Sequence, residues 1–403
     1  MSQVVAAPCS NPQTRIALYY ACMFGMVGIY QPFIPLWFAD RGLSPAEIGL
    51  LLALSSVVRA TANPLVARYA DTREDRKQLV WMLTVAGIVS AFAMLPAYGF
   101  WPVMLLSLLH IAIQAPVNPL GENVILLNLQ ARKLDYGRLR AWGSVAFIAT
   151  SMAGGWYLEG RSADWVMYLF IGCLVLLLFA SFALPGIKAP PSRKEQPPIR
   201  SLLANRFFLL FLLCAALNMA SHAVLTGFST IHWQSAGHSE GTIGFLWAVG
   251  VVSEVILFAF AQPILRRIGI PGMLILGASA AIIRWTGTGA GTELWLLVPM
   301  QILHGITFGA THLGGMTFIQ RHIAPGVSAS GQALYSSLGM GAAMGITMAA
   351  SGWLYESLGG QAFWVMALFS AGSLAAALVV RRKWRDDLMI GYCLFYTSPS
   401  PRD

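Results

Sequence analysis

The chain has 403 residues, of which 57% are hydrophobic and 11% are charged, whereas an ordinary soluble domain carries about 25% charged residues. This composition, with a mean hydropathy of +0.64, excludes a soluble globular protein and indicates a membrane protein. The formal net charge of +9 would suit a nucleic-acid partner, but the Lys and Arg residues follow a membrane topology instead, so no nucleic acid is expected.

Apolar runs of about 20 residues, the length of helix that crosses a bilayer, recur along the whole chain. Because lipid offers no hydrogen bonds to the backbone, these runs must be helical. We therefore predict an all-α polytopic membrane protein with twelve transmembrane helices. They are expected at residues 14–38, 45–71, 78–96, 102–129, 138–159, 165–185, 205–235, 241–265, 272–290, 294–321, 329–356 and 361–381.

The positions of the basic residues predict the orientation of the chain in the membrane. Lys and Arg gather in the loops and helix ends on the side of the N-terminus, with Arg41 and Arg161 as exceptions. Since cytoplasmic loops carry the excess of positive charge, both termini are expected in the cytoplasm. Five cysteines lie too far apart for a disulfide framework or a metal site, so no metal is expected.

The chain contains an internal repeat. Residues 48–71 (IGLLLALSSVVRATANPLVARYAD) align with residues 243–266 (IGFLWAVGVVSEVILFAFAQPILR) at an offset of 195, which puts Arg59 opposite Glu254. Further along, the tripeptide LLH at residues 108–110 recurs as ILH at residues 302–304, at an offset of 194. Because six helices return the chain to its starting side, the repeat predicts two pseudo-symmetric six-helix bundles in parallel orientation.

The repeat and the composition together predict four parts. These are an N-terminal six-helix bundle at residues 1–185, a flexible cytoplasmic linker at 186–204, a C-terminal six-helix bundle at 205–385 and a tail at 386–403. The tail ends in CLFYTSPSPRD, which resembles a translated sequencing adapter. We therefore expect the tail to be partly non-native.

Four ionisable residues fall within the predicted membrane helices: Arg59, Glu122, Glu254 and Arg284. Arg59 lies about 18 Å from the cytoplasmic end of its helix at 1.5 Å per residue, which is near the middle of the bilayer. If all four faced lipid, the free-energy penalty would be on the order of 10 kcal/mol. They are therefore either structural ion pairs, Arg59 with Glu122 and Glu254 with Arg284, or transport groups that line a watery cavity.

Polar residues gather in the same helices. His110, Gln114 and Asn118 follow one another at i, i+4 and i+8, which puts them on one helix face. The seventh and tenth predicted helices contribute Asn218, His222, Gln301, His304, Thr311 and His312. A polar stripe in three helices favours a shared hydrated pathway over isolated packing residues.

The chemistry of these groups suggests their roles. An arginine stays protonated in the membrane and can hold a carboxylate through two hydrogen bonds, whereas a desolvated glutamate or a histidine can take up or release a proton. The expected substrate-binding residues are Arg59, Arg284, His110, Gln114, Asn118 and His222. The expected proton-coupling residues are Glu254, Glu122, His304 and His312. Aromatic residues at similar depth either stack on a substrate ring or only pack: Tyr30, Phe33, Trp247, Trp285 and Phe308.

The loop after the second predicted helix, NPLVARYADTREDRK, contains Asp71, Arg76 and Lys77. Here the chain resembles the major facilitator superfamily, whose loop at this place reads G-x-x-x-D-R-x-G-R-K/R. Ala67 and Thr72 replace the first Gly and the first Arg of that pattern. The resemblance implies a gating role for Asp71 and the basic pair, as a charge latch at the cytoplasmic face.

Longer stretches resemble the phenylpropionate-permease branch of this superfamily: PFIPLWFADRGLSPAEIGLLLA, LDYGRLRAWGSVAF, HWQSAGHSEGTIGFLWAVGVVSEVI, and IIRWTG with QILHGITFGATHL. The resemblance implies a secondary transporter that takes up an aromatic carboxylic acid such as 3-phenylpropionate together with protons. An enzyme is not expected, because enzymes usually need metal-binding His clusters or a sizeable extramembrane domain, and the longest internal loop here spans residues 186–204. It implies a small organic anion and protons as partners, no cofactor besides the proton gradient, and the bacterial inner membrane as the location. A monomer in the lipid bilayer is expected.

Other functions stay open at this point. They are efflux of a drug or metabolite, symport of a sugar or nucleoside with protons, and a membrane sensor that transports nothing. Arginines near mid-bilayer favour an anion over a cationic drug. The sequence contains no P-loop glycine motif, so an ATP-driven pump is not supported.

Overall fold

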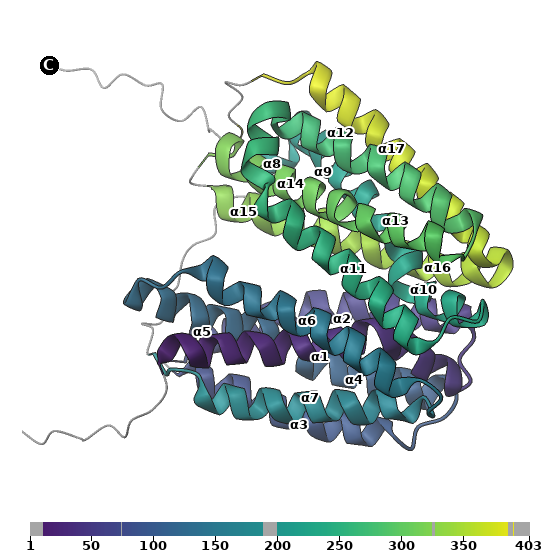
Figure 1. The fold of residues 1–403 in the computed structure, drawn as a ribbon. Helices are drawn as coiled ribbons and strands as arrows, with labels where there is room; N and C mark the ends of the chain where they lie inside the picture. The colour runs from purple at the N-terminus through teal and green to yellow at the C-terminus, as the bar shows by residue number, and fades with distance from the viewer. Residues whose placement is uncertain (1–10, 74, 188–199, 325–326, 386–389, 391–403) are drawn as a thin grey trace, which may run out of the picture. The chain divides into compact units, whose positions relative to one another are not determined.

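The computed structural model describes residues 11–73, 75–187, 200–324, 327–385 and 390, and nearly all of them are helical (Figure 1). The helices of the first part of the chain are α1 (Pro12–Asp40), α2 (Pro45–Asp71), α3 (Arg76–Met94), α4 (Phe100–Gln114), α5 (Val117–Arg132), α6 (Tyr136–Leu158) and α7 (Asp164–Ala183). They are followed by α8 (Arg200–Leu203), α9 (Arg206–Ala220), α10 (Ala223–Ser235), α11 (Glu240–Ala259), α12 (Ala261–Ala290), α13 (Leu294–His304) and α14 (Thr311–His322). The last are α15 (Ser328–Leu334), α16 (Ala343–Leu358) and α17 (Ala362–Arg382), with π-helices η1 (Gly305–Ala310) and η3 (Tyr335–Ala342) and the 3₁₀-helix η4 (Gly359–Gln361).

The predicted all-α membrane fold is confirmed. Ten helical stretches among the described residues are long and apolar enough to cross a membrane. One of them, Ser330–Arg382, is divided by η4 into the eleventh and twelfth predicted spans. The fifth predicted span is α6, which does not reach the hydropathy of the others because Gly, Ser, Thr, Trp and Tyr are interspersed among its apolar residues.

The boundary between the eighth and ninth predicted spans lies within α12. Gly269 has φ 67° and ψ 179° there, whereas its neighbours in α12 are helical. Glycine adopts a positive φ without the steric penalty that a Cβ would bring. The helical residues before Gly269 therefore continue the eighth span, and those after it form the ninth.

The helices form two compact units. The first holds the described residues of Met1–Arg193, Leu225–Val252 and Gly352–Ser357; the second holds those of Lys194–Val224, Ser253–Ser351 and Leu358–Asp403. The units follow contacts rather than sequence halves, because parts of α10, α11 and α16 belong to the first unit. The predicted boundaries at 185, 204 and 385 stay a prediction, and most of the linker and tail lies outside the described residues.

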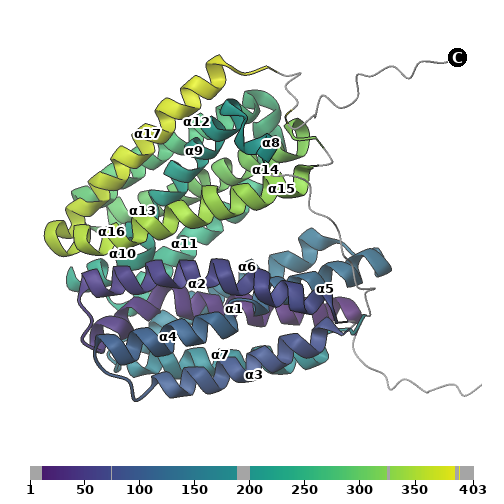
Figure 2. The ribbon, with the colours of Figure 1, turned by 180° about the vertical axis from the view of Figure 1, so that it is seen from behind.

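In the first unit, α1 packs on α6 and α7, and α3 packs on α4 and α7 (Figure 2). Arg41 is only 3% exposed and holds one end of this unit together. Its guanidinium forms an ion pair with Asp164 and lies 4.1 Å from the ring centroid of Tyr98, and its carbonyl accepts a 3.0 Å hydrogen bond from the Gly99 N–H. A buried cation with an anion and an aromatic partner fixes three chain segments to one another.

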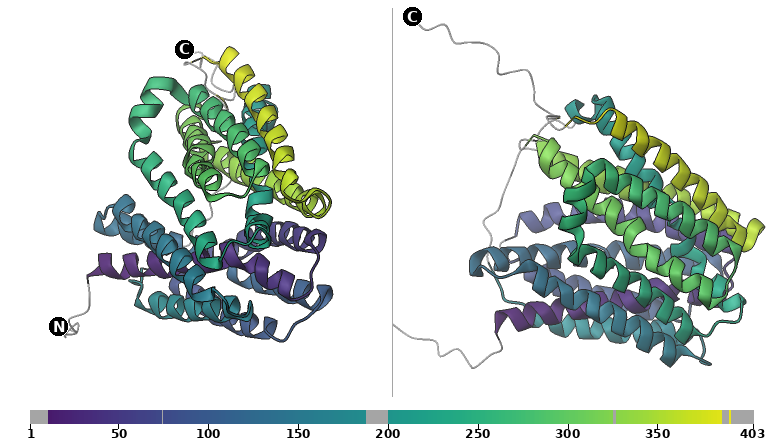
Figure 3. Two further views of the ribbon diagram at one scale, coloured as in Figure 1. Left: turned by 45° about the vertical axis from the view of Figure 1, so that its right-hand side comes forward. Right: turned by 45° about the horizontal axis from the view of Figure 1, so that its top comes forward.

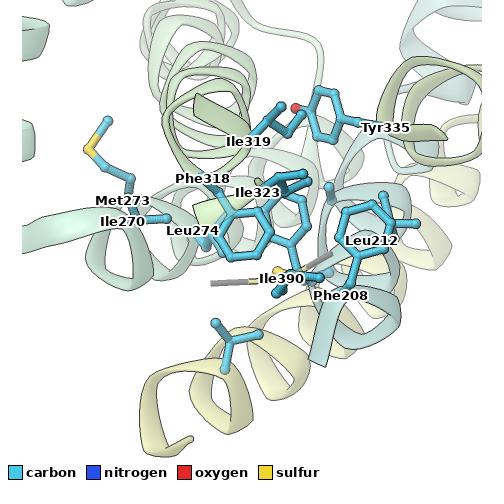
Figure 4. Close-up of a cluster of buried hydrophobic side chains, with 14 of the residues drawn as sticks. Phe208, Leu212, Ile270, Met273, Leu274, Phe318, Ile319, Ile323, Tyr335 and Ile390 are labelled. Carbon is cyan, nitrogen blue, oxygen red and sulfur yellow. The ribbon is translucent and has the colours of Figure 1, made fainter. Parts of the chain in front are cut away.

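In the second unit, α17 packs along α12 and α9, and α12 packs on α14 (Figure 3). An apolar cluster at one end of this unit is built on the stacked rings of Phe211 and Phe318, with centroids 4.1 Å apart. Ile390 belongs to this cluster, as Figure 4 shows. Its backbone N–H donates to the carbonyl of His322 at 2.8 Å, and its carbonyl accepts from the Ala324 N–H at 2.9 Å.

Candidate functional site

A buried arginine is the centre of the polar cluster in the second unit. Arg284 on α12 is 0% exposed. Its Nη1 donates to Nδ1 of His304 at 3.0 Å and to Oγ1 of Thr307 at 3.1 Å, and its Nη2 donates to Oε1 of Gln301 at 3.1 Å. The guanidinium also lies 4.5 Å from the ring centroid of Trp285. A desolvated cation is stabilised here by three hydrogen-bond acceptors and an aromatic face.

The bond from Arg284 fixes the tautomer of His304. A guanidinium has only donors, so Nδ1 of His304 must accept and the ring proton of the neutral form lies on Nε2. That Nε2 is 3.9 Å from Oε2 of Glu254, whose side chain is 24% exposed, while that of His304 is 18% exposed. Glu254 and His304 therefore connect the sealed guanidinium to the accessible surface of this unit.

A second polar layer lies behind this cluster. His222 makes two hydrogen bonds. Its Nδ1 donates to the carbonyl of Asn218 at 3.0 Å, because a carbonyl can only accept, and its Nε2 lies 3.2 Å from Oγ1 of Thr307. Asn218 donates to the Thr307 carbonyl and to Oγ1 of Thr311, both at 2.8 Å. Thr307 thus joins both layers, and the predicted residues His222 and Arg284 belong to one network.

Irregular backbone occurs at the points where these side chains gather. The π-helix η1 begins directly after His304 and contains Thr307, and the helix is broken between α9 and α10 at Ser221 and His222. π-helical turns inside α-helices are frequent at functional sites. Within a membrane, non-helical backbone is tolerated only where it is buried in protein or lines a cavity.

Gly305 allows η1 to approach α11. Its N–H donates to Oγ of Ser253 at 2.9 Å, and a Cβ at this position would lie 2.4 Å from the carbonyl oxygen of Ser253 and 2.9 Å from the backbone nitrogen of Glu254. This close approach of two backbones brings Glu254 next to His304. No side chain larger than hydrogen fits without moving one helix.

We expect Gly305→Ala to lower the thermal midpoint of the purified protein, with a loss of about 1 to 3 kcal/mol from overpacking. Gly172→Ala in α7 is the matched control, because a Cβ there meets nothing within 4 Å. Differential scanning fluorimetry in detergent measures both variants. Equal midpoints for the two variants would contradict the argument.

His312 lies one turn beyond the cluster. The rings of His304, Phe308 and His312 stack in sequence along the helix, with centroids 5.9 and 5.7 Å apart. The ring of Tyr335 lies 6.4 Å from His312. His312 is therefore on the same face as His304, and the stack of Phe308 separates the two imidazoles.

The first unit repeats this arrangement without its charge. Nδ1 of His110 is 2.9 Å from Oγ of Ser90, so His110 and Ser90 meet as His304 and Arg284 do. His110 and His304 are 194 residues apart in the sequence, and so are Ser90 and Arg284. The repeat therefore places a serine in the first unit at the position of Arg284 in the second.

The other polar residues of the predicted α4 stripe lie at the break between α4 and α5. Gln114 is buried, and its Nε2 donates to Sδ of Met26 at 3.7 Å. Asn118 is half-buried, and its Oδ1 has no hydrogen-bond partner among the described residues. His110, Gln114 and Asn118 thus stay on neighbouring turns, but a helix break separates Asn118 from the other two.

Arg59 on α2 is exposed, and it makes no hydrogen bond or ion pair with any described residue. Glu122 on α5 instead accepts a hydrogen bond from the hydroxyl of Tyr20, which lies 3.0 Å from each carboxylate oxygen. The alternative of a structural pair between Arg59 and Glu122 is therefore absent from the described part of the chain. Arg59 therefore has no hydrogen-bond or ion-pair partner within the described part of the first unit.

Sequence reasoning did not select Arg140 on α6. Its guanidinium lies 3.7 Å from the ring centroid of Phe24 and 5.8 Å from that of Tyr20, the residue that holds Glu122. A Cβ on Gly143 would lie 2.6 Å from the Phe24 ring, so this glycine gives the stack its space. The signal was present in LDYGRLRAWG, where a second arginine enters a membrane helix one turn after Tyr136.

The predicted latch residues take different partners. Asp71 and Arg76 form an ion pair at 2.9 Å, and Arg76 also donates to Oδ1 of Asn123. Nζ of Lys77 donates to the carbonyl of Phe182 at 2.8 Å. Asp71 and Arg76 thus join the ends of α2 and α3, and their gating role stays a prediction.

Comparison with known proteins decides the family. The model of the family described as "MFS_1 like family" matches residues 13–366. The chain belongs to the MFS_1 like family. It is therefore a transporter of the major facilitator type and a multi-pass membrane protein.

Curated relatives of this transporter carry several substrate names. It is 35% identical over 368 residues to a protein of Escherichia coli (strain K12) named "Probable 3-phenylpropionic acid transporter", covering 88% of this chain and 94% of that protein. It is 27% identical to the maltose permease of Geobacillus stearothermophilus, covering 85% of this chain and 88% of that protein. Among solved structures, the nucleoside transporter NupG matches with a TM-score of 0.81 at 17% identity, over 93% of this chain and 100% of that one, which shows the shared fold.

Proposed function

We propose that this transporter takes up a small aromatic carboxylate such as 3-phenylpropionate together with protons, across the bacterial inner membrane and with both termini in the cytoplasm. The name of the relative that is 35% identical supports the substrate class. The observation that carries the coupling is the contact chain from Glu254 through His304 to Arg284. Arg59 and Arg284 take separate roles in this proposal.

Arg59 is the proposed anion-binding residue. It is exposed and has no hydrogen-bond or ion-pair partner among the described residues. Two of its N–H groups can meet both oxygens of a carboxylate. Arg284 is fully buried and donates to three side chains, so its guanidinium has less capacity for a substrate.

Glu254 and His304 form the proposed proton site. Nδ1 of His304 accepts from Arg284, so a second ring proton removes that hydrogen bond and sets an imidazolium against a guanidinium. An ionised Glu254 beside Nε2 offsets this repulsion, and a protonated Glu254 does not. Proton uptake therefore changes which partners Arg284 holds, and with them the contacts between α12 and α13.

Transport into proteoliposomes tests the proposal. Purified protein should accumulate labelled 3-phenylpropionate above its external concentration when the outside is more acidic than the lumen, and a protonophore should remove the accumulation. Excess unlabelled maltose should not compete. Accumulation that the protonophore leaves unchanged, or competition by maltose alone, would overturn the proposed coupling or the proposed substrate class respectively.

A further inference from the structure

Tyr30 on α1 belongs to an aromatic stack in the first unit. Its ring centroid lies 4.8 Å from that of Phe170 on α7, which is 2% exposed. The edge of Phe170 meets the ring of His110 at 5.4 Å, and His110 is fixed by its bond to Ser90. The orientation of Tyr30 is therefore determined by a row of buried, mutually packed groups.

Tyr30 differs from the other predicted stacking residues. Phe33 and Trp285 are 0% exposed, and Trp247 is 8% exposed with its Nε1 donating to Thr230. Phe308 stacks on two imidazole rings of its own helix. Tyr30 is half-buried, so part of this residue remains accessible.

The neighbouring charge distinguishes this position further. α2, which carries Arg59, packs on α1, which carries Tyr30, and the Arg59 charge acts on the Tyr30 hydroxyl across this contact. The partly accessible Tyr30 and the guanidinium of Arg59, which has no hydrogen-bond or ion-pair partner among the described residues, thus lie on the neighbouring helices α1 and α2. An aromatic carboxylate has the complementary groups, an anion and a ring, in one small molecule.

We propose that Tyr30 is the residue that selects aromatic over aliphatic carboxylates, by packing against the substrate ring while Arg59 holds the substrate carboxylate. The inference rests on the proposed function. Phe170, His110 and Ser90 act as positioning residues that keep the Tyr30 ring in one orientation. The expected gain from ring packing is specific to an aromatic substrate, since a saturated ring has no π-face.

The test compares 3-phenylpropionate with 3-cyclohexylpropionate, which has the same carboxylate and a saturated ring. In proteoliposomes, Tyr30→Leu should raise the KM for 3-phenylpropionate about three- to tenfold and leave the KM for 3-cyclohexylpropionate within about twofold of the wild type. Tyr30→Phe, which keeps the ring, should retain the discrimination. Tyr168→Leu, at an exposed tyrosine of α7, is the control and should change neither value.

The outcomes separate the two proposals. If the wild type transports neither acid, the proposed function fails. If the wild type transports 3-phenylpropionate and Tyr30→Leu changes both KM values equally, or neither, the role of Tyr30 is overturned and the proposed function stands. Thermal midpoints of the purified variants show whether a substitution destabilises the fold.

Discussion

Replacing Glu254 with Gln is expected to abolish uphill uptake and to leave downhill equilibration of the substrate. Gln keeps the shape of the side chain but cannot carry a proton, so the contact with His304 no longer responds to the pH gradient. With one proton per substrate, one pH unit drives an accumulation of about tenfold, because a tenfold ratio corresponds to about 1.4 kcal/mol. Glu254→Gln should reduce this ratio to about one.

Two flux measurements check this expectation. Accumulation is measured under an inward proton gradient, and counterflow is measured without a gradient in vesicles preloaded with unlabelled substrate. Glu356→Gln on the exposed surface of α16 is the control and should keep full accumulation. Full uphill uptake by Glu254→Gln would exclude the proton role of this residue. Loss of both uphill uptake and counterflow would indicate a structural role instead.

The sequence identified Glu254, His304 and Arg284 as polar residues of apolar helices, but it did not predict the contact chain in which His304 stands between the other two. The repeat aligned His110 with His304 at one offset, and the structure places both in equivalent contacts. The same offset relates Ser90 to Arg284. Because serine carries no charge, the pattern of ionisable residues in the sequence does not reveal this relation. Apolar periodicity predicts which face of a helix is buried, but not which neighbouring helix that face meets.

Other contacts depend on backbone geometry that periodicity does not encode. The π-helix Gly305–Ala310 rotates the residues after His304 relative to an ideal α-helix, so a count of 3.6 residues per turn misplaces their partners. Glu122 accepts from the Tyr20 hydroxyl of α1 rather than from Arg59. Sequence patterns identified Glu122 as unusual but contained no information on its partners.

The two arginines that the sequence predicts near mid-bilayer illustrate the same limit. Both looked equivalent in the sequence, as single cations in apolar helices that could hold a carboxylate. Burial separates them: Arg284 is 0% exposed and donates to three side chains, while Arg59 is exposed and has no hydrogen-bond or ion-pair partner among the described residues. A cation that already donates to three side chains contributes to the structure of its own network, whereas a cation with no such partner is available to a ligand.

Because of this difference in burial and hydrogen bonding, a large effect on substrate binding is expected from replacing Arg59. Arg59→Gln is expected to raise the KM for 3-phenylpropionate by roughly tenfold to a hundredfold, because a hydrogen bond to a charged group contributes about 1.5 to 3 kcal/mol. Arg59→Lys keeps the charge but has no planar fork, so an intermediate KM is expected. Since Arg59 has no hydrogen-bond or ion-pair partner among the described residues, neither change should lower the thermal midpoint.

Arg68→Gln is the matched control, because this exposed arginine on the same helix lies at its end rather than its middle. Initial rates of substrate exchange, measured without a proton gradient, keep binding separate from coupling. A normal KM in Arg59→Gln would show that the carboxylate binds elsewhere, and a lowered thermal midpoint would show that Arg59 stabilises the fold. A raised KM with unchanged stability is the result that a substrate contact predicts, because Arg59 has no hydrogen bond or ion pair with a described residue to lose.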